Sequence, residues 1–288
     1  MPDPSGVPDA ADLTDPSVPA AIAGLVARRA SVLAAIADAC ARSGRDPAGV
    51  TLVAVSKTVN AGRLRAAVDA GLTTLGENRV QEAEAKARAI SGVRWHLIGP
   101  LQANKARRAV AIFDLIESVD SVALAVRLDR LAGELRPGRP LPILLQVNVD
   151  ADPAKAGFGP DVLAAVLPGL VVLPNLELRG LMTVGRLAAA AGEARSTFQA
   201  LRVLSERLRA PAPPAVPVGA VAASSSTRGL GPALSMGMSD DYPVAIEEGA
   251  TIVRVGRALF GERPHVNAAG AGHVQPRGEV PASPTDGA

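Results

Sequence analysis

A lysine ends one of the most apolar stretches of the chain. The segment VAVSKTVN, residues 53–60, is apolar and β-branched up to Lys57, and only four of the thirty basic residues are lysines. A desolvated lysine can have its pKa lowered enough to act as a nucleophile near neutral pH, which arginine cannot do. Lys57 is therefore a candidate for Schiff-base chemistry with a carbonyl compound. The alternative is a surface lysine whose charged end reaches water.

A phosphate-binding pattern lies near the other end of the folded region. The segment VRVGRALFG, residues 253–261, runs from an apolar strand through Gly256 into a short helix. The backbone N–H groups of Gly256 and Arg257 would then stand at a helix N-terminus, where anions bind. The alternative is that the glycine only makes a turn.

The segment LSMGMSDD, residues 234–241, could supply the rest of a phosphate site. Ser235 and Ser239 offer hydroxyl groups, and Gly237 permits close approach of the backbone. In barrel proteins a phosphate is frequently held by the loops after the last two strands. The alternative is that these serines cap the helix that follows.

Eight short apolar runs alternate with longer helical patterns. We expect strands at residues 51–56, 72–76, 94–99, 113–118, 142–149, 176–184, 232–236 and 251–256. Eight strand–helix units with nearly continuous apolar strands predict a closed parallel (β/α)8 barrel. A leading helix at about 18–43 would close the bottom of the barrel or flank it.

Polar residues and other ligand candidates gather where the expected strands end. Besides Lys57, they are Glu77, Asn78, His96, Asn148, Met182, Thr183, Ser235, Arg254 and Gly256. The carboxyl ends of the strands form the working face of such barrels. We therefore predict one ligand site there, suited to a phosphorylated carbonyl compound.

Composition limits the other classes of function. The net charge of +2, with both signs interspersed, gives no basic stripe and argues against nucleic acid as a partner. Cys40 is the only cysteine, so we expect no disulfide framework, no thiolate metal site and a small inert core residue. The first residues lack a secretory signal pattern, and no run of about 20 uninterrupted apolar residues is present. We expect a cytoplasmic protein without a membrane or metal partner.

The expected domain organisation is one folded region between two tails. Residues 1–17 and 265–288 are rich in Pro, Gly, Ala and Asp without periodicity and are predicted to be disordered. Residues 18–264 form the predicted barrel, interrupted by a Pro/Ala/Ser-rich insertion at about 210–231.

Nine short motifs occur in order across about residues 19–263: AVSKT, GENRVQE, WHLIGPLQANK, FDLIESVDS, QVNVD, KAGF, LRGLMTV, LSMGMSDD and VRVGRALFG. As a set, they resemble the motifs of one known family, the pyridoxal phosphate homeostasis proteins. The resemblance implies a single barrel like the N-terminal domain of alanine racemase, the type III fold of pyridoxal phosphate proteins. It also implies binding of pyridoxal 5'-phosphate without an established reaction, with apo-enzymes as possible partners. Nothing in the sequence requires more than a monomer, which is the expected state.

The resemblance assigns roles to individual residues. Lys57 corresponds to the Schiff-base lysine; Ser235, Gly256 and Arg257 to the phosphate contacts; Arg254 to the partner of the pyridine nitrogen; Asn78 and Met182 to residues beside the ring. His96 could join them or be a core residue making one hydrogen bond. A cation beside the pyridine nitrogen disfavours its protonation, which suits holding the cofactor better than carbanion chemistry.

The sequence departs from the family pattern in three places. Arg79 stands where the family often has tyrosine, and Arg257 stands where a threonine is frequent. A hydroxyl contact to phosphate is then replaced by a charge or lost. The third departure is the insertion at 210–231, which makes the strand after it harder to position.

Two enzymatic alternatives stay open at this stage. An amino-acid racemase needs a second base opposite the lysine, and the only tyrosine is Tyr242. A Schiff-base aldolase needs carboxylates around the lysine, and Glu77 is the only clear acid at the neighbouring strand end.

Overall fold

The computed structural model describes residues 17–185, 194–210 and 229–261. Apart from Ser17, the tails predicted at 1–17 and 265–288 lie outside the described residues, as does most of the predicted insertion at 210–231. The division into two tails and a central domain therefore stays a prediction.

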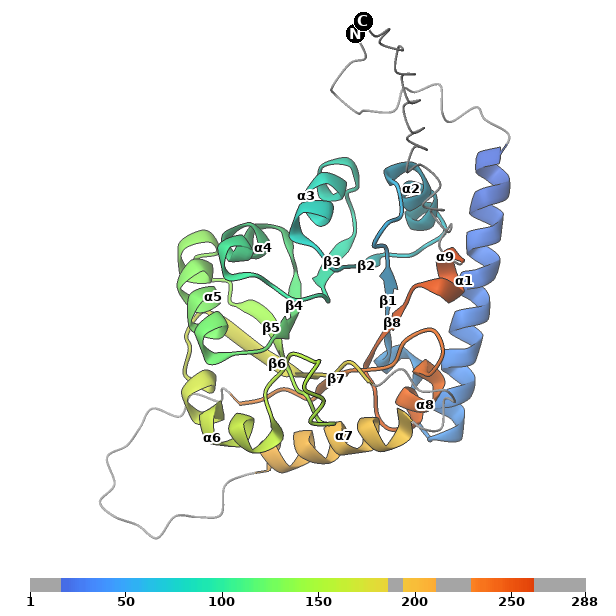
Figure 1. The fold of residues 1–288 in the computed structure, drawn as a ribbon. Coiled ribbons are helices and arrows are strands. Elements are labelled where there is room, and N and C mark those ends of the chain that lie inside the picture. Colours follow the sequence, from blue (N-terminus) through green and yellow to red (C-terminus); the bar gives the residue numbers. More distant parts are fainter. Residues whose placement is uncertain (1–16, 186–193, 211–228, 262–288) are drawn as a thin grey trace, which may run out of the picture.

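Eight parallel strands close into a barrel in chain order, with β8 pairing back onto β1 (Figure 1). The strands are β1 Thr51–Val55, β2 Thr74–Glu77, β3 Arg94–Leu97, β4 Leu115–Val119, β5 Leu141–Gln146, β6 Leu176–Met182, β7 Ala233–Ser235 and β8 Ile252–Val255. The predicted (β/α)8 barrel is confirmed. The prediction started β2 and β4 two residues early and ended β5 three residues late, at turns and caps where apolar residues continue.

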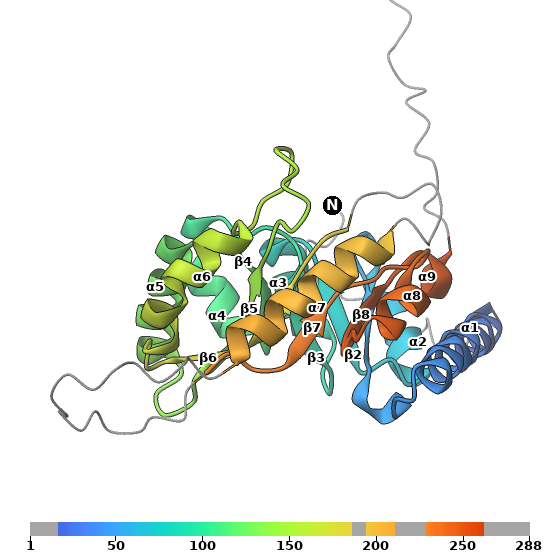
Figure 2. The ribbon, with the colours of Figure 1, turned by 90° about the horizontal axis from the view of Figure 1, so that it is seen from below.

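Helices cover the outside of the barrel (Figures 1 and 2). They are α1 Ser17–Arg42, α2 Ala61–Asp69, α3 Val80–Ala89, α4 Ala106–Ile112, α5 Val122–Leu135, α6 Pro160–Val171, α7 Arg195–Arg209, α8 Tyr242–Glu247 and α9 Arg257–Phe260, with 3₁₀ turns η2 Pro47–Gly49 and η3 Ala103–Lys105. Asn60 begins α2 immediately after the Lys57 segment, because its side-chain oxygen accepts the Arg63 N–H at 2.8 Å. The loop that carries Lys57 is therefore short, because α2 begins directly after Asn60.

Side-chain alternation along the strands separates two apolar cores. The larger core lies between the sheet and the helices and contains Ala54 of β1. The smaller core fills the barrel interior with Val53, Leu115, Leu144, Met182 and Ile252. Because successive side chains of a strand point to opposite faces, a polar residue in register with this smaller set faces the interior.

Helix α1 flanks the barrel rather than closing its bottom, packing against α2, α8 and α9 (Figure 1). It buries Leu25, Val32 and Ile36, and Cys40 is fully buried as expected. Arg28 interrupts its apolar run and donates from Nε to the Leu259 carbonyl at 2.7 Å. Within the described residues, the segment Ala20–Arg42 is the one helix that length and composition alone would allow to cross a membrane.

Candidate functional site

A hydrogen-bonded chain of four polar side chains crosses the barrel interior. We call His96, Glu117, Ser235 and Arg254 the interior network. His96 Nδ1 lies 2.7 Å from one Glu117 oxygen, and Ser235 Oγ donates to the other at 2.5 Å. Arg254 donates to Ser235 Oγ at 2.6 Å and to the Thr183 carbonyl at 2.7 Å. The four residues come from β3, β4, β7 and β8, so the network joins strands that are not neighbours.

The electrostatics of the interior network depend on one carboxylate. Glu117 is fully buried, and burial alone would raise its pKa. The hydrogen bond from His96, together with the charges of His96 and Arg254 and the Ser235 hydroxyl, outweighs burial and holds the pKa below its usual value. Burial lowers the pKa of Arg254, against the attraction of Glu117 and Asp241. A guanidinium stays protonated in proteins, so the interior keeps a paired positive charge.

Lys57 lies in a tight turn directly after β1. The Val59 N–H donates to the Ser56 carbonyl at 3.0 Å, which makes Lys57 and Thr58 the central residues of the turn. Thr58 has φ of 67°, a left-handed conformation that is uncommon for a residue other than glycine. Such a conformation persists only where the surrounding structure enforces it, and it is found most often at functional sites.

A cavity of about 210 Å³ joins the turn after β1 to the turn after β8. Its lining includes Lys57, Asn60, Arg63, Gly256 and Arg257. Three of the predicted site residues, Lys57, Gly256 and Arg257, therefore share one cavity, and its charged lining is cationic. Arg257 also pairs with Asp240, and its side chain is about half exposed (55%).

The loop after β7 brings Ser239 to the backbone of the β8–α9 turn. The N–H groups of Gly256 and Ala258 both point to Ser239 Oγ, at 3.2 and 3.5 Å. Gly237 makes this loop possible, because its φ is 90° and an added Cβ would lie 2.6 Å from the Ala245 Cβ. Ser235, by contrast, is engaged in the interior network. The two serines thus occupy different environments.

The remaining predicted residues are distributed around the strand ends. Met182 is fully buried in the interior core. Asn78 lies in the loop after β2, and its Oδ1 atom is buried without a hydrogen-bond partner among the described residues. Asn148 donates to the carbonyls of Asp152 and Lys155, at 2.8 and 3.2 Å, so its amide organises its own loop.

Two residues with clear structural roles were missed in the sequence. Glu117 follows Leu115 by two positions, so alternation along β4 predicts that it faces the interior. Lys86 carries no such signal, because a single lysine in a helical pattern usually faces water. It is instead 8% exposed and pairs with Glu77 at 2.6 Å. Glu77 therefore has a cationic partner between β2 and α3, on the outer side of the sheet.

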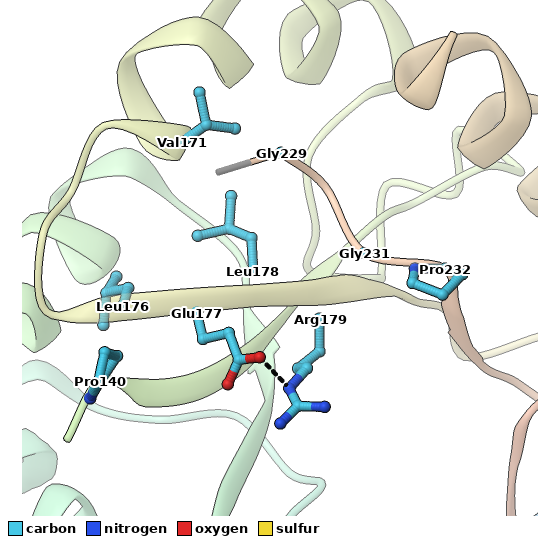
Figure 3. Close-up of a pocket in the computed structure, with 9 residues that line it drawn as sticks. All are labelled: Pro140, Val171, Leu176, Glu177, Leu178, Arg179, Gly229, Gly231 and Pro232. Carbon is cyan, nitrogen blue, oxygen red and sulfur yellow. Dashed lines mark ion pairs between the residues drawn. The ribbon is translucent and has the colours of Figure 1, made fainter. Parts of the chain in front are cut away.

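A second pocket, of about 350 Å³, lies at the opposite end of the barrel (Figure 3). Its lining precedes or begins β5, β6 and β7: Pro140, Val171, Leu176, Glu177, Leu178, Arg179, Gly229, Gly231 and Pro232. Glu177 and Arg179 form an ion pair of 2.7 Å there. None of the predicted site residues lines this pocket.

Comparisons with known proteins agree with this geometry. Residues 33–264 match the family model for the N-terminal domain of alanine racemase. The pyridoxal phosphate homeostasis protein of Pseudomonas aeruginosa is 42% identical over 238 residues, covering 81% of this chain and 94% of that protein. The Escherichia coli protein of the same name is 37% identical over 234 residues, covering 79% and 92%.

Solved structures extend the comparison. PipY of Synechococcus elongatus, solved with pyridoxal phosphate bound, superposes with a TM-score of 0.67 at 42% identity, covering 82% of this chain and all of that one. An alanine racemase of Clostridium difficile shares the fold alone, with a TM-score of 0.54 at 14% identity, over 75% of this chain and 52% of the racemase.

Proposed function

This chain belongs to the pyridoxal phosphate homeostasis protein family, and on that premise we propose that it holds pyridoxal 5'-phosphate at the carboxyl-end mouth of the barrel. The observation that carries the proposal is the single cavity lined by Lys57, Gly256 and Arg257. It combines an amine with backbone donors and cationic side chains, which are the groups that an aldehyde and a phosphate require.

Several features of this chain fit such a ligand. Ser239 Oγ accepts two converging backbone N–H groups, the acceptor role that a phosphate oxygen takes at a helix start. We therefore assign the hydroxyl contact to Ser239, because Ser235 is engaged with Glu117 and Arg254. The buried Oδ1 of Asn78 has no partner among the described residues, and a ligand donor at the mouth would satisfy it.

The chain's own residues support the proposal that the protein holds the cofactor rather than catalysing a reaction with it. When bound, pyridoxal phosphate supplies an aldehyde that condenses with amines and a ring that can accept electron density. Arg254 keeps a positive charge in the interior, and a positive charge beside a ring nitrogen disfavours a proton there. The racemase alternative is disfavoured because Tyr242 is buried in the outer core and burial raises its pKa.

We propose that the protein works in the cytoplasm as a monomer that carries or buffers the cofactor and passes it to apo-enzymes. A direct test is incubation with pyridoxal phosphate, reduction with borohydride and mass analysis of the labelled peptide. We expect the label on Lys57, with none in Lys57→Ala and a normal yield in the Lys105→Ala control. Lys57→Ala should fold normally, because Lys57 lies in a loop at the mouth.

Transfer is tested separately with an apo pyridoxal-dependent enzyme and a trap that consumes free cofactor. Reactivation that survives the trap, and that exceeds reactivation by the same amount of free cofactor, supports direct delivery. Labelling elsewhere than Lys57 would refute the attachment site. Racemisation of alanine in proportion to protein concentration would refute the non-catalytic assignment.

A further inference from the structure

Behind Lys57, on the outer side of the sheet, lies a buried ionic cluster. It consists of Ser56, Glu77 and Lys86, which we call the strand-end cluster. Lys86 Nζ donates to Glu77 Oε1 at 2.6 Å and to the Ser56 carbonyl at 2.7 Å. Ser56 Oγ donates to the same Glu77 oxygen at 2.6 Å. The cluster joins the end of β1, the end of β2 and helix α3.

The cluster acts on the peptide that carries Lys57. The Ser56 carbonyl belongs to the peptide bond between Ser56 and Lys57, and it accepts from both Lys86 Nζ and the Val59 N–H. Two donors on one carbonyl set the plane of that peptide. The second donor also closes the turn in which Thr58 has its positive φ. Lys86 Nζ is thus a second donor to the carbonyl that closes this strained turn.

The cluster also fixes the residue directly before Lys57. Strand β1 ends at Val55, and the next residue, Ser56, is fully buried with its hydroxyl bonded to Glu77 on the outer side of the sheet. Lys57 follows as a turn residue and lines the same cavity as Val55, a cavity that neither Glu77 nor Lys86 lines.

We propose that the strand-end cluster is a positioning device that presents the Lys57 amine to the cofactor site. Lys86 and Glu77 do not line that site and act through the backbone of residues 56–59. The proposal rests on the function proposed above, since it concerns how the same lysine is used. A desolvated ion pair is a costly way to stabilise a fold, because apolar residues of similar volume often serve as well. The contact of Lys86 with the Ser56–Lys57 peptide gives the ion pair a role in positioning Lys57 instead.

The test removes both charges together, because Lys86→Met alone would leave an unpaired buried carboxylate that destabilises the fold. Glu77→Gln combined with Lys86→Met keeps the approximate shapes and removes the ionic contact with the Ser56 carbonyl. The matched control is Glu134→Gln combined with Arg130→Met, an exposed ion pair between residues of α5. Each protein is titrated with pyridoxal phosphate, and Lys57 labelling is measured after borohydride reduction.

We expect the double variant to fold and to need about tenfold to a hundredfold more cofactor for half-maximal labelling of Lys57, the loss typical of a misplaced reactive group. Competition by inorganic phosphate should be unchanged, because Gly256 and Ser239 are untouched. Wild-type concentration dependence in a folded double variant would overturn the proposal. Absence of labelling in the wild-type protein would instead contradict the proposed function.

A second measurement covers a double variant that does not fold. Ser56→Ala removes the hydroxyl bond to Glu77 and a longer one to the Gly76 carbonyl, and it leaves the ion pair in place. We expect a several-fold loss in labelling, together with faster hydrogen exchange at the Val59 amide, which donates to the same carbonyl. Unchanged labelling with unchanged exchange would overturn the proposal, and the exchange measurement does not depend on cofactor binding.

Discussion

Replacing Glu117 by glutamine tests whether the interior network is held together by charge. Glutamine has nearly the same shape, but it removes the negative charge that pairs with Arg254 and His96. The Arg254 guanidinium, only 4% exposed, would then keep only the attraction of Asp241, and His96 would lose its carboxylate partner. Removing one partner of a buried ionic pair typically costs about 3–5 kcal/mol. That is a large part of the roughly 5–15 kcal/mol by which native proteins are stable.

Urea unfolding at neutral pH measures this loss. With a dependence on urea of about 2–3 kcal/mol per molar, the midpoint of Glu117→Gln should fall by roughly 1–2.5 M. The control is Glu134→Gln, which removes a carboxylate that pairs with Arg107 and Arg130 at the surface. Exposed ion pairs contribute little, so we expect no measurable shift in the control.

The pH dependence gives a second criterion. The folded-state pKa of Glu117 is lowered, so its stabilising contribution is complete above the unfolded carboxyl pKa of about 4.3. It is lost as the pH falls through the folded-state value. The difference in stability between wild type and Glu117→Gln should therefore shrink in acid. A difference that is small at neutral pH, or that does not change with pH, would refute a charge-based network.

Three further predictions concern the mouth of the barrel. Gly237→Ala should lower the free energy of unfolding by roughly 2–4 kcal/mol in urea, because backbone strain at φ of 90° adds to the clash with Ala245. The control is Gly44→Ala, which should show only the strain, because its φ is 65° and no atom lies within 4 Å of the added Cβ. Thr58→Gly should change the free energy of unfolding by less than about 1 kcal/mol, because relief of left-handed strain offsets the added entropy of the unfolded chain. It should still lower Lys57 labelling, because the turn becomes less rigid. Unaltered labelling would contradict the role of the turn. Ser239→Ala should weaken cofactor binding several-fold in a spectroscopic titration without unfolding, whereas Ser235→Ala should lower stability by about 1–3 kcal/mol; the reverse pattern would return the phosphate contact to Ser235.

The barrel could be predicted because its signal is repeated along the chain. Each apolar run was followed by a helical pattern, and eight such units admit few other folds. Lys57 and Gly256 could be identified as turn residues because each lies at or directly after the predicted end of an apolar strand. Helix α1 was expected within a residue of its observed ends, although its flanking position depends on packing that no local pattern encodes.

Side-chain partners were harder to predict than positions. Ser235 ends β7, and Ser239 lies four residues later in the glycine-containing loop that follows. The path of that loop separates the interior network from the β8–α9 turn. Lys86 and Glu77 are nine residues apart on a helix and a strand, and their contact depends on how α3 packs against the sheet. Asn148 follows the carboxyl end of β5, and its amide donates to a carbonyl of its own loop, a partner that no local pattern indicates. Its place in the cofactor site stays a prediction.

The bond from Ser235 to Glu117 joins β7 to β4 through the barrel interior, between strands that share no backbone pairing. A hydrogen bond between these strands helps to fix the width of the barrel interior before any ligand binds. Loading and unloading would then require little rearrangement of the scaffold, and the ordering entropy lost on binding would be small. If the protein carries its cofactor as proposed, a barrel that keeps its shape when empty can both bind and release the cofactor without refolding.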